Sequence, residues 1–251
     1  VMTELSFMSI QNVPAGKAAI FCNDSGDYFQ AHKVNFVDCD INVKIISATQ
    51  DTVAYLEYID YNGTMSFGNH ITSTGGFRAT LNVENYYTFP SASGFTADLV
   101  TGTSAFLIIT ASGIYGNTQP FEPAVAGNFA IICENGANLS VVGTTIAGFE
   151  TAILNNNVGT GCHIDCVGLM IDDCINDIII SHPATIGAFT GAADLSKITI
   201  DPASTFSSAF SQPHAGGGFI VSGNIFNGEK VNEVAEISTL IKNQALGLIS
   251  G

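Results

Sequence analysis

Apolar and polar positions along the chain alternate in short runs, each about the length of a β-strand. Residues 36–46 and residues 170–180 place apolar residues and turn-forming Asp or Asn in the same order. Each run predicts a short strand, a polar corner and a second strand. Recurrence of such a unit indicates a solenoid, in which stacked coils bury a continuous core.

A simpler marker recurs in the first half of the chain and indicates the length of a coil. An apolar residue is followed two positions later by Asn or Asp at Ile10/Asn12, Phe36/Asp38, Tyr58/Asp60 and Val83/Asn85. Later, Thr144 and Met170 begin stretches that also align with each other. A period in the twenties gives each coil a few short strands, with coils stacked about 4.8 Å apart. We therefore predict an all-β fold, a right-handed parallel β-helix over residues 1–228.

Three segments depart from this pattern. Residues 62–119 are less regular, and we interpret them as coils with longer loops, with an inserted β-sandwich as the alternative. Residues 201–218 are rich in Ser, Ala and Gly and predict a loop. Residues 229–251 predict a short C-terminal helix that caps the solenoid or joins copies of the chain, because apolar residues recur there at helical spacing. These residues are Val231, Val234, Ile237, Ile241 and Ala245.

The charge balance excludes several classes of partner. Charged residues make up 12% of the chain, about half of the usual share of roughly 25%. Seven Lys and Arg stand against 22 Asp and Glu, which gives a formal net charge of −15, and Arg78 is the one arginine. A nucleic-acid-binding protein needs a basic surface, so this class is excluded. No apolar run approaches the roughly 20 residues of a membrane helix, so no membrane insertion is expected.

The six cysteines are expected to be mostly buried free thiols, because the chain is too long to depend on disulfides. The sequence Cys162-His163-Ile164-Asp165-Cys166 resembles a metal site at first. On a strand, however, both thiols and Ile164 share one face, and His163 and Asp165 share the other. These ligands do not converge as a structural zinc requires, so we predict no metal. No phosphate-binding glycine loop is present, and no cofactor is expected.

Four aspartates are the candidates for catalysis. Asp38 with Asp40, or Asp172 with Asp173, would supply the two acids of a glycosidase. The competing interpretation is structural: Asp38, Asp60 and Asp172 recur at one coil position, where a carboxylate bonds the turn backbone. Recurrence favours the structural role, because a catalytic pair is needed once.

Tyrosines offer the other candidate chemistry, because their rings stack on sugars and their hydroxyls form hydrogen bonds. The richest local set is Tyr55, Tyr58, Tyr61, Tyr86 and Tyr87. The same residues would equally fill a core or a subunit contact, and aromatic side chains more often do so.

The repeated coils at 36–46 and 170–180, the stretch 148–153 and the C-terminal helix together resemble right-handed parallel β-helix proteins of the viral spike and phage tailspike kind. The resemblance implies a homotrimer on a virion surface or in an extracellular setting, which binds a host-surface carbohydrate or another virion protein. We therefore expect a non-enzymatic structural or adhesion protein. A polysaccharide-degrading glycosidase or lyase on the same scaffold is the alternative.

Overall fold

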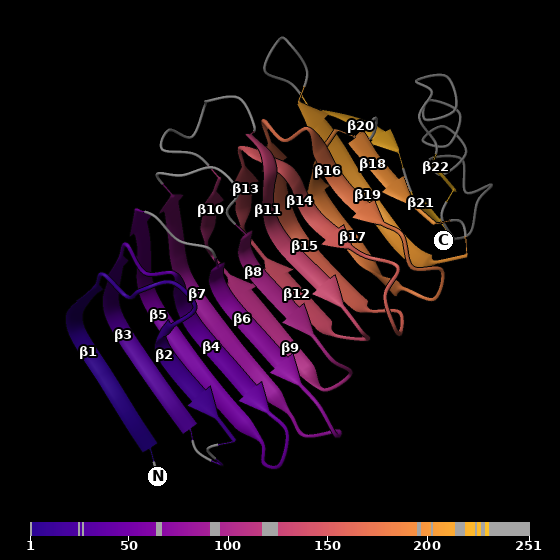
Figure 1. Ribbon diagram of the computed structural model, residues 1–251. Coiled ribbons are helices and arrows are strands. Elements are labelled where there is room, and N and C mark those ends of the chain that lie inside the picture. Colours follow the sequence, from indigo (N-terminus) through magenta and orange to yellow (C-terminus); the bar gives the residue numbers. More distant parts are fainter. Residues whose placement is uncertain are drawn as a thin grey trace.

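The chain folds as an all-β parallel solenoid, which confirms the predicted fold class (Figure 1). The computed structural model describes residues 2–24, 26, 28–63, 67–90, 96–116, 125–194, 197–201, 203–213, 219–223, 225–226 and 229–230. Strands stack side by side from the N-terminal coil, drawn in indigo, to the C-terminal strands, drawn in orange and yellow.

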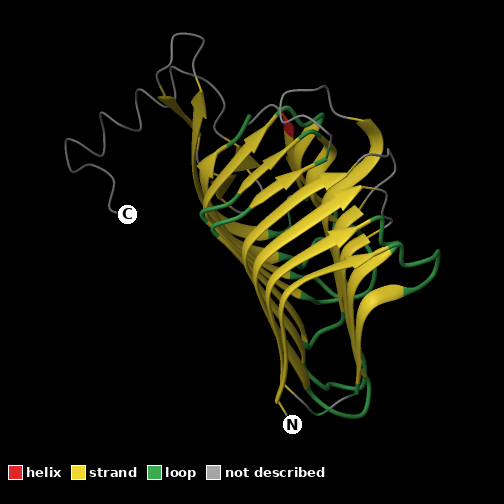
Figure 2. Ribbon diagram, turned by 90° about the vertical axis from the view of Figure 1, so that its left-hand side faces the viewer, coloured by secondary structure: helices red, strands yellow, loops and turns green. Residues whose placement is uncertain are grey.

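Two sheets form the walls of the solenoid, and Figure 2 shows them as layers that face each other. The first, 14-stranded sheet contains β1 (Met2–Gln11), β3 (Tyr28–Val37), β5 (Thr52–Gly63), β7 (Ala79–Pro90), β9 (Ala105–Thr110), β10 (Gly113–Tyr115), β12 (Asn138–Val142), β13 (Thr145–Ala147), β15 (His163–Asp172), β17 (Ile186–Ala192), β19 (Thr205–Pro213), β20 (Phe219–Gly223), β21 (Ile225–Phe226) and β22 (Glu229–Lys230). The second, eight-stranded sheet contains β2 (Ala18–Asn23), β4 (Ile41–Ser47), β6 (Phe67–Ser73), β8 (Thr96–Thr101), β11 (Val125–Glu134), β14 (Phe149–Asn155), β16 (Asn176–Ile180) and β18 (Ile198–Ile200).

Each coil contributes one strand to each sheet, and strands of successive coils pair in parallel. In two coils the strand of the first sheet is divided in two, into β9 and β10 and into β12 and β13. The parallel order ends at β19, which pairs in parallel with β17 but antiparallel with β20 and β21. The predicted loop at 201–218 is therefore wrong for residues 205–213, which form a strand.

The strands of the first sheet bend at one position in each of seven successive coils, where a residue adopts the left-handed backbone conformation with positive φ. The residues that occupy this position, in coil order, are Phe7, Lys33, Tyr58, Asn85, Ala111, Gly143 and Gly168. We call this column the bend ladder. At the bend two successive side chains point outward, so the buried positions step by three residues instead of two: Ala31 is followed by Val34, and Leu56 by Ile59.

The core lies between the two sheets and consists of stacked apolar side chains from equivalent positions of the coils. An aromatic column runs through it: the Phe36 and Tyr61 rings lie 4.9 Å apart, as do the Tyr61 and Tyr86 rings. All three side chains are fully buried. Parallel stacking places similar residues in contact, so each coil buries the apolar face of the next.

The repeat inferred from the sequence is present, but the register predicted for its two copies is wrong by one residue. Phe36 is linked through successive strand pairs to Ile171 and not to Met170. Asp38 therefore corresponds to Asp173, and both adopt positive φ at a corner. Asp172 and Asp60 do not share that corner position, because Asp60 lies within β5, beside Asn35 and Tyr87. A one-residue shift in a strand reverses which face a side chain occupies.

Strands within the irregular segment 62–119 pair with the coils before and after them in both sheets. At the C-terminus, Glu229 and Lys230 form β22 and so do not begin a helix, while the rest of the predicted helix, 231–251, lies outside the described residues. In the part of the chain that is described, no helix has the length and apolar character needed to cross a membrane.

Candidate functional site

The first predicted acid pair, Asp38 and Asp40, lies at the corner between β3 and β4. Asp38 has φ of 52°, and its side chain lies close to Gly63 of the next coil. Asp40 Oδ2 accepts a hydrogen bond from the backbone N–H of Gly16 at 2.6 Å. The carboxylate of Asp40 thus links the turn of one coil to the turn of the coil before it, as the structural interpretation expects.

The second predicted pair, Asp172 and Asp173, lies at the same corner of a later coil. Asp172 Oδ1 accepts a hydrogen bond from the backbone N–H of Asp173 at 3.0 Å, and Asp173 has φ of 48°. Five strand spacings separate this corner from that of Asp38, a distance of about 24 Å along the solenoid. The two pairs are therefore not brought together into one site.

The five predicted tyrosines divide between the core and the outer surface. Tyr61 and Tyr86 are fully buried in the core column. Tyr55, Tyr58 and Tyr87 point outward from the first sheet, and the side chains of Tyr58 and Tyr87 are 48% and 37% exposed. Two of the five therefore serve as core residues, and three remain available for binding.

A surface cavity of about 240 Å³ lies beside the exposed tyrosines, at the bend of the first sheet. It is lined by Lys33, Val34, Asn35, Tyr58, Asp60, Asn85 and Tyr87. Six of these residues form a grid across β3, β5 and β7. The first column, Lys33, Tyr58 and Asn85, belongs to the bend ladder; the second, Asn35, Asp60 and Tyr87, lies two residues further along each strand. We call this cavity the bend cavity.

Ring contacts fix one wall of the bend cavity. The Lys33 Nζ atom lies 5.0 Å from the centroid of the Phe7 ring and 5.9 Å from that of the Tyr58 ring. The His32 ring meets the Phe7 and Tyr58 rings edge to face, at 5.8 and 5.5 Å. The ammonium group of Lys33 is therefore held between two aromatic faces, an arrangement that attracts cations.

Asp60 is the carboxylate in the bend cavity. Partial burial raises its pKa above the usual value, and among the described residues no hydrogen bond or charge opposes that shift. Its neighbours in register, Asn35 and Tyr87, contribute an amide and a phenol to the same wall. The Asn35 Oδ1 atom accepts a hydrogen bond from Asn62 Nδ2 at 2.9 Å, which holds the Asn35 amide in place.

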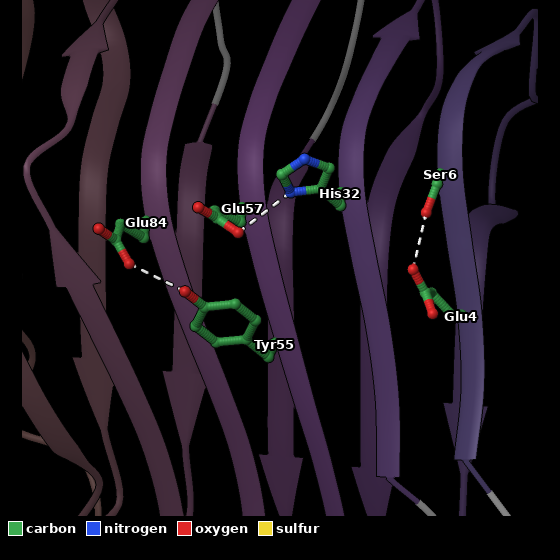
Figure 3. Close-up of polar contacts among 6 residues, drawn as sticks. All are labelled: Glu4, Ser6, His32, Tyr55, Glu57 and Glu84. Atoms are coloured by element: carbon green, nitrogen blue, oxygen red, sulfur yellow. Dashed lines mark hydrogen bonds and ion pairs between the residues drawn. The ribbon is translucent and has the colours of Figure 1, made fainter.

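A row of polar side chains continues from the bend cavity over the outer face of β3, β5 and β7 (Figure 3). The His32 Nδ1 atom lies 3.0 Å from Glu57 Oε2, and the Tyr55 hydroxyl donates to Glu84 Oε2 at 2.8 Å. Burial and the Glu84 carboxylate together raise the pKa of Tyr55 to about 12. Glu57 and Glu84 are partners in register, so two carboxylates face outward from adjacent strands.

A second, smaller cavity of about 180 Å³ lies further along the first sheet. It is lined by Phe106, Leu107, Ile108, Asn138, Leu139, Ser140, His163 and Asp165. At its rim the His163 Nε2 atom lies 3.0 Å from Asp165 Oδ2. Exposed carbon atoms dominate this cavity, and its polar groups are fewer than those of the bend cavity.

The predicted orientation of the cysteine cluster is confirmed. Cys162, Ile164 and Cys166 are buried, while His163 and Asp165 lie on the outer face. All six cysteines are buried free thiols, as expected from the sequence. Within the described ranges, no three His, Cys, Asp or Glu side chains come close enough together to hold a metal ion.

Sequence reasoning named Tyr58 and Tyr87 but missed the other members of the bend cavity. The signal was present as three copies of one spacing, Lys33-x-Asn35, Tyr58-x-Asp60 and Asn85-x-Tyr87, in successive coils. Comparison of the chain with protein-family models, with curated proteins and with solved structures gives no significant match. The geometry of the chain itself therefore carries the functional argument.

Proposed function

We propose that the chain is a non-enzymatic adhesion and structural protein whose bend cavity binds a surface carbohydrate. The observation that carries this proposal is the grid of six polar and aromatic side chains across three coils. Tyr58 and Tyr87 offer ring faces for stacking against sugars. Asn35, Asn85 and Asp60 offer the hydrogen-bond donors and acceptors that fix the orientation of a ligand.

The shape of the site suits a linear glycan. Tyr58 and Tyr87 come from successive coils, so a chain of sugars that crosses the strands meets a new set of side chains at each coil. The rigid ladder of parallel strands holds these side chains in fixed relative positions, which reduces the entropy lost on binding.

A binding role agrees better with the carboxylates than an enzymatic role does. Most glycosidases use two carboxyl groups about 5–10 Å apart on either side of the scissile bond. Among the described residues, Asp60 is the one carboxylate that lines the bend cavity. Asp40 and Asp172, two of the acids considered for catalysis, accept hydrogen bonds from turn backbone.

The setting that we propose follows from the resemblance to viral spike and tailspike proteins: a homotrimer at a virion surface, with the solenoid as a durable shaft. The parallel solenoid supports this proposal because it provides a long, continuously hydrogen-bonded body. Light scattering of the purified chain tests the assembly. A mass three times that of the 26.2 kDa chain is expected, and a monomer at micromolar concentration contradicts the trimer.

Glycan binding is tested with a panel of neutral and charged oligosaccharides and two cavity variants. Tyr87→Ala and Tyr58→Asn are each expected to weaken binding about tenfold through the lost stacking. Tyr28→Ala is the matched control, since Tyr28 is 41% exposed on β3 but does not line the cavity. Equal binding by all three variants, or no binding to any glycan, overturns the proposal. Release of new reducing ends favours the enzyme instead.

A further inference from the structure

We infer that the bend cavity selects a glycan that carries free amino groups, such as a polymer of glucosamine, over its N-acetylated or acidic counterparts. The inference rests on the proposed carbohydrate binding and adds the charge of the ligand to it. The observation behind it is the arrangement of carboxylates around the two exposed tyrosines.

The charges near the bend cavity are predominantly negative. Asp60 lies within the lining, and Glu57 and Glu84 each immediately precede a lining residue, Tyr58 and Asn85. Glu57 and Glu84 face outward side by side (Figure 3). Among the described residues of the lining, Lys33 is the one permanently charged cation, against one carboxylate in the lining and two more on the outer face of β5 and β7.

Lys33 is also not placed to receive an acidic sugar freely. Its Nζ atom already lies over the Phe7 and Tyr58 rings. A sialic acid or uronic acid in the cavity would meet the negative potential of Asp60 and its neighbours, on a chain whose formal net charge is −15. Like-charge contacts of this kind exclude a ligand as effectively as missing contacts do.

An ammonium group on the ligand, in contrast, would find two favourable interactions in the cavity, one with a carboxylate and one with aromatic rings. Partial burial disfavours the charge on the Asp60 carboxylate, and among the described residues no hydrogen bond or cation offsets this, so an ammonium in the cavity would supply a partner. The exposed rings of Tyr58 and Tyr87 both neighbour Asp60 in the grid, Tyr58 along β5 and Tyr87 across on β7, and such rings attract cations through their π faces. N-acetylation removes the charge and both of these interactions.

Three oligosaccharides of equal length test the inference by calorimetry at about pH 6 and low salt, where amines are charged. They are the glucosamine hexamer, the N-acetylglucosamine hexamer and a galacturonate hexamer. The glucosamine hexamer is expected to bind at least about fivefold more tightly than the N-acetylated one. The galacturonate hexamer is expected to bind weakest, and added salt should reduce the preference for free amines.

The variant Asp60→Asn keeps the shape of the side chain and removes its charge. It is expected to reduce the affinity ratio between the glucosamine hexamer and the N-acetylated hexamer to less than about twofold, because the charge that distinguishes the two ligands is lost. Glu4→Gln, an exposed carboxylate on β1 outside the cavity lining, is the control and should preserve the preference. Tyr87-dependent binding without a preference for the amine, or a preference for galacturonate, overturns this inference but not the proposed function. Binding of none of the panel's neutral or charged glycans overturns both.

Discussion

The phenol oxygen of Tyr86 lies 3.3 Å from each carboxylate oxygen of Asp98, and both side chains are fully buried in the solenoid. Asn69 Nδ2 donates to Asp98 Oδ1 at 2.5 Å, and the Tyr61 hydroxyl donates to Asn69 Oδ1 at 2.7 Å. Burial raises the pKa of Asp98 to about 7, although the hydrogen bonds from Asn69 and Tyr86 oppose the shift. The network therefore places a proton-sensitive group inside the core.

This network predicts that the protein becomes less stable as the pH rises toward neutrality. The pKa of Asp98 is higher in the folded chain than its usual value of 3.8, so the folded state binds the proton more tightly. The resulting stability is complete below about pH 4 and is lost as the pH rises through about 7. Unfolding by guanidinium should show a fall of about 3 kcal/mol between about pH 5 and pH 8 from Asp98.

Variants at buried and exposed carboxyls separate this effect from others. Burial also raises the pKa of Asp177 to about 7, so this residue contributes a decline in the same direction. Asp98→Asn should remove a large part of the pH dependence, and the double variant Asp98→Asn with Asp177→Asn should remove most of it. Glu4→Gln, which changes an exposed carboxyl, should leave the dependence unchanged. A parent chain with equal stability at both pH values contradicts the prediction.

Periodicity predicted the solenoid and the face of the cysteine cluster, because both depend on local alternation. It predicted register poorly, because the adjacent Asp172 and Asp173 offer two alignments with Asp38, and strand pairing selects Asp173. The bend ladder also breaks the alternation in each coil. Asn or Gly would reveal a left-handed position in the sequence. In this chain Phe7, Lys33 and Tyr58 occupy that position in the first three coils, so the sequence gives no sign of the bend there.

The same bend explains why the sequence could not show which tyrosines are buried and which are exposed. Strict alternation places Tyr55 and Tyr61, six residues apart, on one face and Tyr58 on the other. The structure places Tyr55 and Tyr58 outside and Tyr61 in the core, because the left-handed conformation at Tyr58 shifts the alternation by one residue. The bend cavity depends on that shift and on the pairing of three coils, neither of which a single sequence displays.

Two glycines with positive φ should respond very differently to substitution by alanine. A Cβ at Gly102, where φ is 107°, would overlap the carbonyl oxygen of Ser73 in the adjacent coil. A Cβ at Gly76, where φ is 84°, would meet no atom within 4 Å. Gly76→Ala carries the backbone strain alone, whereas Gly102→Ala also forces the coils apart. Chemical denaturation should show Gly102→Ala to be at least about 2 kcal/mol less stable than Gly76→Ala; equal losses contradict this packing.

The six thiols should resist modification in the folded protein. All are buried without disulfides, and burial raises the pKa of five of them, that of Cys174 to about 12, which disfavours the reactive thiolate. The hydrogen bond with Cys133 lowers the pKa of Cys162, but the Cys162 side chain is only 1% exposed, so a reagent does not reach it. A thiol-specific reagent such as dithionitrobenzoate should therefore react with essentially none of them under native conditions. All six should react once the protein, reduced beforehand and freed of the reductant, is unfolded in guanidinium. Prompt reaction of one or two thiols with the native chain contradicts the burial described above.

Replacement of Tyr58 by asparagine should cost the fold less stability than the same replacement at Tyr28, while it weakens the proposed site. Tyr58 adopts φ of 55° in the bend ladder, a conformation that costs a bulky residue about 1 kcal/mol and that asparagine adopts more readily. The Tyr58 side chain is 48% exposed, and loss of its half-buried ring, which also contacts His32, opposes this gain. Tyr28→Asn is the matched control, since Tyr28 is similarly exposed but lies in extended backbone. Asparagine is disfavoured in strands, so the control should lose stability. A smaller fall in the denaturation midpoint for Tyr58→Asn than for Tyr28→Asn supports the strained bend, because both variants lose a similarly exposed ring. Equal falls, or a larger fall for Tyr58→Asn, contradict it.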